Sequence, residues 1–265
     1  MTGSGGDPVR VAVVYPDLLG TYGDSGNATV LAQRLRWRGH AVDQVTALAG
    51  DVVPDSCDIY VVGGGEDLPQ GLAARDLGGP RPLHRAVASG SVLLAVCAGL
   101  QIVGTSFVRP DGVEADGLGL LDCRTIPGRR RRAVGELVVD PDSRDGLPVL
   151  TGYENHFGVT TVGTGSRPAG RVRSGVGNGD GTDGAVTGHV YGTYLHGPVL
   201  ARNPALADLL LSWVVGPLGP LDDAECDELR RERLRAAPGR ASRGSGRSRS
   251  WRGLAAGRGK EPSRR

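Results

Sequence analysis

Cys97 occupies a position at which a thiol could act as a nucleophile. It directly follows five apolar residues, Val92–Val96, and precedes Ala98 and Gly99. In open parallel sheets, ligands bind beyond the carboxyl ends of the strands, and a tight strand-to-helix turn there exposes a nucleophile. Small residues after the thiol let that turn close, and the helix that follows lowers the thiol pKa through its dipole. A strand that ends in cysteine is by itself more typical of an inert buried thiol, so the assignment depends on other segments.

Two further segments supply groups that thiol chemistry requires. The sequence VVGGGED ends another apolar run, and Gly63 to Gly65 would allow backbone N–H groups to approach a ligand closely. The alternative is an ordinary tight turn. The sequence YGTYLHGP places His196 after an extended run, and a nucleophilic thiol needs such a base within hydrogen-bond reach. No role is assigned to His156. The other three histidines are interpreted as structural: His40, His84 and His189.

The apolar pattern predicts the elements that must hold these residues. We expect strands over 9–16, 56–67 and 91–97, and helices over 27–40 and 81–90. Strands that alternate with helices predict an α/β fold with a mostly parallel sheet and right-handed crossovers. The thiol and the three-glycine turn then both end strands of this sheet.

The second half of the chain is predicted to be rich in strands. Residues 203–215 form an apolar helix that starts with Asn203 as its cap and Pro204 at its first position. The Gly-rich segment 163–184 is expected to be a mobile surface loop. It is not a phosphate loop, because it lacks both the Lys-Ser/Thr ending and a following helix. We predict one α/β domain over 8–218. Its second half contains four extended segments: 118–126, 132–140, 147–163 and 184–200.

Residues 230–265 form a basic tail with 13 Arg or Lys against two Glu, whereas the rest of the chain is acidic and the whole carries +2. The tail has almost no apolar periodicity, so we predict that it is disordered. A solvated extension is favoured over contact with nucleic acid or an anionic membrane, and no nucleic-acid partner is expected.

The cysteines and the apolar runs restrict the class of protein. The four cysteines do not have the spacing of metal ligands, so we expect no metal and a reducing compartment. No apolar run approaches the roughly 20 residues that span a bilayer, and the N-terminal residues lack an apolar signal region. The sequence therefore predicts a soluble cytoplasmic protein. The cysteines are Cys57, Cys97, Cys123 and Cys226.

Together, GGGED, CAGLQ and YGTYLHGP resemble in this order the motifs of the class I glutamine amidotransferases. These are thiol-dependent glutaminases with a flavodoxin-like α/β fold. YPDLLGTYGDSGNATVLAQRLRWRG (15–39), supported by GYENHFG (152–158), is most similar to the cobyric-acid-synthase-like branch. Within that branch the glutaminase subunits of lipid II isoglutaminyl synthases are most similar. The resemblance covers residues 8 to 215 and excludes the tail.

The resemblance implies the roles of the reacting groups. Cys97 would be the nucleophile. His196 would be the general base, and then the acid that protonates the leaving ammonia. The backbone N–H groups of Ala98 and of Gly65, or Gly64, would form the oxyanion hole.

The resemblance also implies the residues that bind glutamine. An arginine that precedes a glycine and an acidic residue would hold the α-carboxylate, for which a bidentate guanidinium is suited. In RRRRAVGELVV we select Arg132, with Arg131 as the alternative register. Gln101, Tyr153 and Asn155 are expected to line the rest of the glutamine pocket.

The chain departs from class I members two residues after the histidine, where Pro198 replaces their acidic residue. His196 would then lack the nearby carboxylate that orients the imidazole ring. The resemblance implies that a partner subunit, a Mur-ligase-like ATP-dependent enzyme, supplies that acid. The local alternatives are Asp17, Asp24, Glu66 and Asp67.

The function implied is that of one subunit in a heterodimer. This chain would hydrolyse L-glutamine through a Cys97 thioester and pass ammonia to the partner. The partner would use ATP and Mg to amidate the D-glutamate of lipid II in peptidoglycan synthesis. No P-loop motif occurs in this chain, so no cofactor is expected in it. The alternatives are a glutaminase for another acceptor, such as a corrinoid carboxyl, and a non-catalytic binding subunit.

Overall fold

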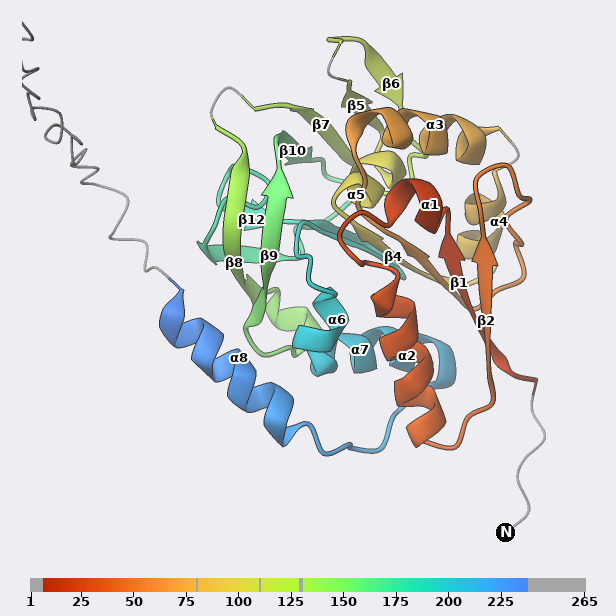
Figure 1. Ribbon diagram of the computed structural model, residues 1–265, viewed down its shortest axis with the longest axis vertical. Coiled ribbons are helices and arrows are strands. Elements are labelled where there is room, and N and C mark those ends of the chain that lie inside the picture. Colours follow the sequence, from red (N-terminus) through yellow and green to blue (C-terminus); the bar gives the residue numbers. More distant parts are fainter. Residues whose placement is uncertain (1–6, 80, 110, 129–130, 238–265) are drawn as a thin grey trace, which may run out of the picture.

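The computed structural model describes residues 7–79, 81–109, 111–128 and 131–237 (Figure 1). A six-stranded sheet forms its centre, and five neighbouring strands are parallel, as the sequence predicted. The sixth strand, β13, pairs antiparallel with β14 at one edge. The order across the sheet is β13 (Ala185–Thr187), β14 (Val190–Thr193), β4 (Val92–Val96), β3 (Ile59–Val62), β1 (Val9–Val14) and β2 (Val42–Ala47).

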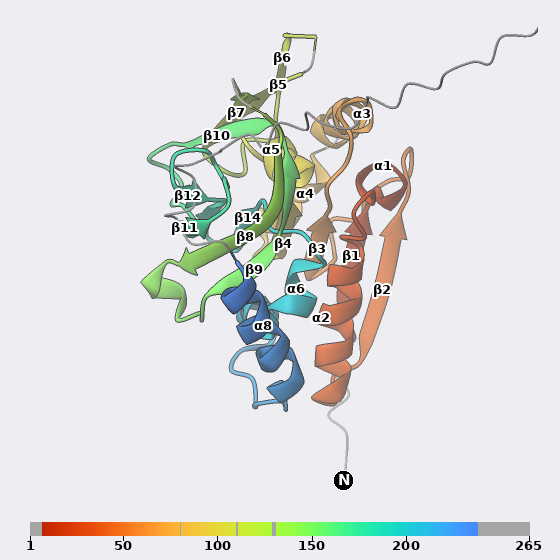
Figure 2. The same ribbon diagram turned by 60° about the vertical axis from the view of Figure 1, so that its left-hand side comes forward.

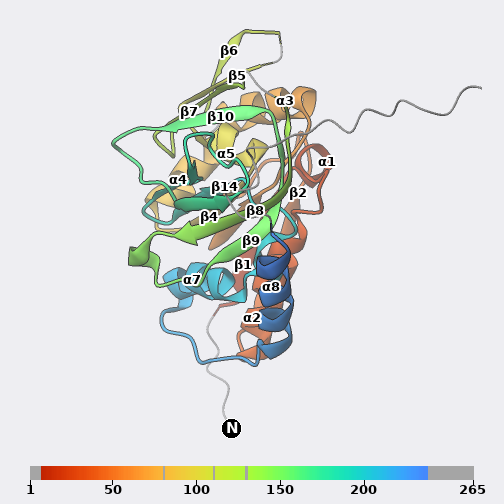
Figure 3. The same ribbon diagram turned by 90° about the vertical axis from the view of Figure 1, so that its left-hand side faces the viewer.

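Helices pack on this sheet because its central strands are apolar on both faces. All four residues of β3 and all five of β4 are buried, which is typical of strands covered on both sides. On one side, α2 (Gly26–Trp37) and α7 (Pro204–Val215) pack against each other (Figure 3). The other helices of the domain are α1 (Pro16–Leu19), α3 (Asp67–Gly78), α4 (Pro82–Ala88), α5 (Ala98–Val103) and α6 (Val199–Arg202).

The second half adds two smaller four-stranded sheets, which confirms its predicted β character (Figure 2). The first has the order β10 (Gly158–Val162), β7 (Cys123–Pro127), β5 (Ser106–Val108) and β6 (Glu114–Asp116). The second has the order β12 (Thr182–Asp183), β11 (Gly170–Ser174), β8 (Ala133–Pro141) and β9 (Leu150–His156), and the short 3-10 helix η1 (Ser143–Asp145) follows β8.

The Gly-rich segment 163–184 is not the mobile surface loop that its composition suggested. It contains β11 and β12, and its Asn178 is completely buried. The Asn178 side chain donates to the carbonyl of Gly184 and accepts from its N–H, at 2.9 and 3.0 Å. Glycines with positive φ, such as Gly177, form the turns that bring these groups together. The composition therefore reflected tight turns in an ordered segment.

The chain after the main domain begins with a helix that the sequence analysis assigned in part to a disordered tail. This helix, α8 (Ala224–Ala236), includes residues 230–236, so the predicted start of the tail at 230 is wrong. The reason is a specific attachment: Arg34, 3% exposed, binds Asp223 at the start of α8 and also Asp208. The prediction for residues 238–265 lies outside the described residues.

Asn203 precedes α7 as expected, but its side chain does not cap that helix. It instead bonds to the backbone of Thr151 in β9 and to the carbonyl of Val199. Among the elements that the sequence analysis did not predict are the half-exposed edge strand β2 and the helix α3. Within the described ranges, no helix has the length and apolar character needed to cross a membrane.

Candidate active site

Cys97 lies in the tight turn that its sequence context predicted, between β4 and α5. Its φ of 53° and ψ of −104° are strained for a residue with a Cβ atom, and its side chain is 5% exposed. Gly99 allows the turn to close, because a Cβ there would lie 2.4 Å from the carbonyl oxygen of Val62. The turn therefore holds the thiol at the carboxyl edge of the sheet.

His196 reaches the same edge from the neighbouring strand. β14 runs parallel to β4, and the Cys97 N–H donates to the carbonyl of Thr193, three residues before the histidine, at 2.9 Å. The His196 backbone pairs in both directions with Tyr153 of β9, at 2.7 and 3.1 Å. The imidazole is buried, and one ring nitrogen, Nε2, has no hydrogen-bond partner among the described residues.

The other ring nitrogen of His196 contacts a carboxylate of this same chain. His196 Nδ1 lies 2.9 Å from Asp24 Oδ2, and the Asp24 side chain is completely buried. The expectation that His196 lacks a nearby carboxylate of its own chain is therefore wrong, whereas an acid from a partner subunit stays a prediction. Asp24 belongs to the loop between α1 and α2, so the pairing spans 172 residues of sequence. It compensates for the missing acid at Pro198.

The other local alternatives have different partners. Asp17 accepts hydrogen bonds from the backbone N–H of Ala49, and Glu66 accepts one from the hydroxyl of Tyr22. The side chain of Asp67 lies outside the described part of the structure. Asp24 is thus the candidate that reaches the histidine ring.

Gly64 lies where Cys97, His196 and Asp24 converge. A Cβ atom at Gly64 would be 2.6 Å from His196 Cε1 and 3.1 Å from Asp24 Oδ2. The same point is 3.4 Å from Cys97 Cβ. No larger residue fits there without moving these groups, so the three side chains form one compact cluster.

The charge in this cluster is set by opposing effects. Burial lowers the pKa of His196, but its hydrogen bond to Asp24 and its contact with Cys97 outweigh burial and raise that pKa. Because Asp24 accepts from Nδ1, the free Nε2 is the nitrogen that can exchange a proton with the thiol. The hydrogen bond to Asp24 therefore favours the protonated, imidazolium form of His196.

Two backbone N–H groups beside the thiol are available for an oxyanion. Ala98 and Gly65 both line the cavity that contains Cys97. Neither of their N–H groups donates to another described residue. The Gly64 N–H is unavailable because it donates to Asp24 Oδ2 at 2.9 Å, so the geometry excludes Gly64 from the predicted oxyanion hole.

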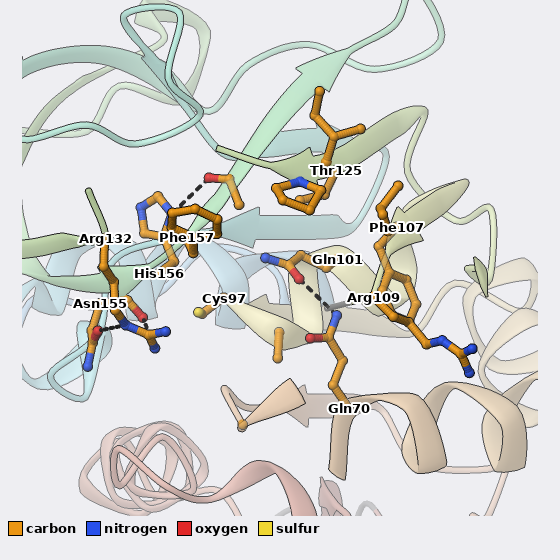
Figure 4. Close-up of a pocket in the computed structure, with 16 residues that line it drawn as sticks. Gln70, Cys97, Gln101, Phe107, Arg109, Thr125, Arg132, Asn155, His156 and Phe157 are labelled. Carbon is orange, nitrogen blue, oxygen red and sulfur yellow. Dashed lines mark hydrogen bonds between the residues drawn. The ribbon is translucent and has the colours of Figure 1, made fainter. Parts of the chain in front are cut away.

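A cavity of about 240 Å³ opens beside Cys97 (Figure 4). Arg132, Gln101 and Asn155 line it, as predicted for the glutamine pocket. Arg132 comes from the segment before β8, and its Nε donates to Asn155 Oδ1 at 2.5 Å. Arg131 does not line this cavity, which favours Arg132 for carboxylate binding.

Tyr153 is absent from the cavity wall, contrary to its predicted role in the glutamine pocket. It contributes the backbone that pairs with His196, and its ring centre is 6.4 Å from the imidazole. Tyr22, which the sequence analysis missed, is closer to that ring at 4.7 Å, and its hydroxyl accepts from Asn155 at 2.9 Å. Both tyrosine rings therefore lie near the imidazole of His196.

Several lining residues were also missed, among them Gln70 and Thr125. Gln70 is on α3, which the sequence did not predict, so no pattern identified it. His156, left open before, also lines the cavity and stacks on Tyr194 at 3.9 Å. Its ring nitrogens contact the carbonyl of Gly158 and the carboxylate of Glu154.

The remaining histidines and buried cysteines lie away from this cavity. His84 contacts the carbonyl of Leu118, and His189 stacks on Trp213. Burial raises the pKa of both the Cys57 and the Cys123 thiols, the latter to about 12. These thiols are therefore protonated packing residues. The described residues contain no group of three or more side chains placed to hold a metal ion.

The parallel sheet and this site define a class of protein, the thiol-dependent glutamine amidotransferases. Residues 10–204 match the CobB/CobQ-like glutamine amidotransferase domain, and the chain belongs to this family. It is therefore an enzyme that uses glutamine as its nitrogen donor. The crystal structure of a glutamine amidotransferase shares the fold, with a TM-score of 0.53 and 22% identity over 77% of this chain and 98% of that one.

Curated relatives are similar over most of both chains. The subunit GatD of lipid II isoglutaminyl synthase (glutamine-hydrolyzing) from Staphylococcus aureus strain N315 is 36% identical over 80% of this chain and 86% of its own length. The same subunit from Streptococcus pneumoniae is 31% identical over 77% and 79%. Cobyric acid synthase from Azorhizobium caulinodans is 35% identical, but over only 56% of this chain and 30% of that protein.

Proposed function

We propose that this chain is the glutaminase subunit of a two-subunit lipid II isoglutaminyl synthase. The observation that carries the proposal is its 36% identity to such a subunit over 86% of that subunit's length. The cluster of Cys97, His196 and Asp24 supports it, because glutamine hydrolysis needs an activated thiol.

In the proposed reaction, the Cys97 thiolate attacks the carboxamide carbon of L-glutamine. The carbonyl oxygen becomes an oxyanion next to the N–H groups of Ala98 and Gly65. Arg132 binds the α-carboxylate and fixes the distance between that group and the thiol. Asp24 keeps the imidazole oriented during this step.

The C–N bond then breaks, and His196 Nε2 gives its proton to the departing nitrogen. Ammonia and a Cys97 thioester result. Water, deprotonated by His196, attacks the thioester carbonyl and releases glutamate with the regenerated thiol. Burial of the imidazole limits its exchange with bulk solvent between these steps.

The ammonia is used by a Mur-ligase-like partner subunit in this proposal. That subunit binds ATP and Mg, activates the D-glutamate α-carboxyl of the lipid II stem peptide, and forms D-isoglutamine. In this proposal lipid II binds to the partner subunit, and this chain binds L-glutamine. The similar proteins from S. aureus and S. pneumoniae are named as subunits of a synthase, which supports an assembly of this kind.

The test is glutamine hydrolysis by the purified chain, wild type beside Cys97→Ser, with and without a co-expressed Mur-ligase-like partner. We expect glutamate release that requires Cys97 and rises with the partner, and amidated lipid II when ATP is added. The matched control is Cys57→Ser, which removes a buried thiol outside the cavity.

Three results would separate the alternatives. Glutamate release without lipid II amidation would indicate another acceptor, such as a corrinoid carboxyl. Partner binding with no turnover under any condition would indicate a non-catalytic subunit. Equal turnover by Cys97→Ser and wild type would refute the thiol mechanism.

A further inference from the structure

Asp183 is a buried carboxylate that lies outside the cavity beside Cys97. It belongs to β12 and is 1% exposed. One of its oxygens accepts from the Thr193 hydroxyl at 2.6 Å, and the other accepts from the Tyr194 N–H at 3.2 Å. No cationic side chain among the described residues bonds to it. A carboxylate that is buried without a cation costs stability, so its place in the fold needs a reason other than stability.

The residues that Asp183 binds form the link between β14 and His196. β14 ends at Thr193, and the next two N–H groups bond to side chains instead of a neighbouring strand. The Tyr194 N–H donates to Asp183, and the Leu195 N–H donates to the Thr193 hydroxyl oxygen at 3.0 Å. Because an ionised carboxylate can only accept, the Thr193 hydroxyl must give its hydrogen to Asp183. One carboxylate therefore fixes the whole link.

Thr193 also fixes the segment that carries the nucleophile. Its carbonyl accepts from the Cys97 N–H at 2.9 Å, and it pairs with Val96 where β14 runs parallel to β4. The segments of the thiol and the base are thus both attached to Thr193, which is itself attached to Asp183. A shift of Thr193 would change the distance between Cys97 and His196, on which proton exchange depends.

The residue after Asp183 permits this close approach of β12 to β14 (Figure 2). A Cβ atom on Gly184 would lie 2.1 Å from the carbonyl oxygen of Gly192 in β14, so no larger residue fits there. Gly184 also has a φ of 62°, which favours glycine. The ordered Gly-rich segment 163–184 thus brings a carboxylate of the second small sheet to the edge of the central sheet.

Burial and neighbouring charges have opposing effects on the Asp183 carboxyl. Burial raises its pKa to about 6, although its two hydrogen bonds lower it. Two groups of β9 also act on this pKa, and His156 lowers it whereas Glu154 raises it. Tyr191 of β14 also faces the carboxylate: burial, and then the charge of Asp183, raise the pKa of its hydroxyl. At pH 8 the Asp183 carboxyl is therefore ionised, and both of its oxygens accept.

We propose that Asp183 is a positioning residue, which acts through Thr193 to hold the thiol and the imidazole at their reacting distance. The inference rests on the proposed function, since it takes Cys97 and His196 as the reacting groups. Asp183→Asn has the same shape and tests the carboxylate directly. Because Thr193 and Tyr194 donate to different oxygens, an amide in the same position places its NH₂ group against one of these donors.

The test measures glutamine hydrolysis by the chain with its co-expressed partner at pH 8, beside thermal unfolding. Asp183→Asn should lower kcat about 30-fold and change KM less than about threefold, because its contacts are outside the cavity. Its melting temperature should not fall, because removal of a buried charge without a cation offsets the lost hydrogen bond. The matched control is Asp180→Asn, an exposed aspartate of the same segment, which should leave kcat and KM unchanged.

Variants of Thr193 test the same link from its other end. Thr193→Val keeps the shape and removes the hydroxyl, so kcat should fall about as much as in Asp183→Asn. Thr193→Ser keeps the hydroxyl and should retain most of the wild-type kcat. Because both residues act through one hydrogen bond, the double variant Asp183→Asn/Thr193→Val should have about the same kcat as either single variant.

Several results would overturn the proposal. One is an unchanged kcat in Asp183→Asn, and another is a kcat that falls together with the melting temperature. Effects of Asp183→Asn and Thr193→Val that multiply in the double variant would show two independent roles and would also refute it. If Asp183→Asn does not fold, equal kcat values in Thr193→Val and Thr193→Ser would refute the proposal.

Alkylation of Cys97 by iodoacetamide, followed by mass spectrometry, separates this inference from the proposed function. It measures the activation of the thiol and needs no glutamine turnover. We expect alkylation of Cys97 at pH 8 to be about 10-fold slower in Asp183→Asn than in wild type, and equal rates would overturn the positioning role. If wild type releases no glutamate, alone or with the partner, the proposed function fails, and the alkylation rates still decide the role of Asp183.

Discussion

The carboxyl edge of the six-stranded sheet and the β-rich half contribute differently to one cavity. The sheet edge holds Cys97 in a strained turn and buries His196 among backbone contacts, so its geometry is fixed by the main chain. The β-rich half contributes Arg132, whose side chain is exposed, and Asn155, whose side chain is half-buried. Their polar groups, a guanidinium and an amide, are at the ends of the side chains and bond to each other. The sheet edge is therefore suited to the chemical step, and the β-rich half to substrate selection. Variants at the edge should affect kcat, and variants of the cavity-lining residues in the β-rich half should affect KM.

The largest effect is expected at Asp24, which belongs to the sheet-edge cluster. Asp24→Asn should lower kcat about 1,000-fold, because the imidazole loses the carboxylate that orients it. The asparagine also cannot hold the raised pKa of His196, so the alkaline limb of the kcat/KM profile should move to lower pH. Steady-state kinetics from pH 6 to 10 would measure both. Asp17→Asn is the matched control, and an unshifted limb in Asp24→Asn would contradict this assignment.

A substitution at Gly64 tests whether the absence of a side chain there is required for catalysis. Gly64→Ala should lower kcat about 100-fold, since its Cβ would displace the His196 ring from the thiol. The matched control, Gly78→Ala, adds a Cβ that meets no neighbour. Measurement of kcat at saturating glutamine, beside thermal unfolding of both variants, distinguishes a displaced base from an unfolded chain. An unchanged kcat in Gly64→Ala would show that the cluster tolerates rearrangement.

A substitution at Arg132 tests the role of the β-rich half in substrate binding. Arg132→Ala should raise KM for glutamine about 10- to 100-fold while kcat falls much less, because the lost contact is to the α-carboxylate. Arg131→Ala should have little effect, since its side chain lines a different cavity. If Arg131→Ala gives the larger rise in KM, the two arginines exchange roles.

Truncation after Ala237 should have the smallest effect. The residues that line the cavity end at Gly158, and His196 is the last member of the catalytic cluster. We expect glutaminase kcat/KM to change by less than about twofold. Truncation after Asp222 would in addition remove Asp223, a partner of the buried Arg34, and should lower the melting temperature. Loss of activity in the shorter deletion would show that the tail acts on the site.

The two regions also differed in how well sequence patterns predicted them. Apolar runs located β1, β3 and β4, and with them the position of Cys97, because buried parallel strands have a strong signal. Asp24 remained one of four alternatives, since no local pattern links a loop residue to a histidine 172 positions later. Gln70 and the strands in 163–184 had no signal, because side-chain networks and glycine turns, rather than periodicity, position them.

The distance in sequence between Asp24 and His196 has a consequence for synthesis of the protein. A ribosome-bound chain that has emerged as far as β13 already contains the thiol, its turn and Asp24, but not the base. The thiol cannot be activated until β14 has joined the sheet beside β4 and brought His196 to Asp24. Nascent chains and chains terminated before His196 therefore cannot hydrolyse the cell's glutamine. Ammonia release begins only after nearly the whole domain has been translated and folded.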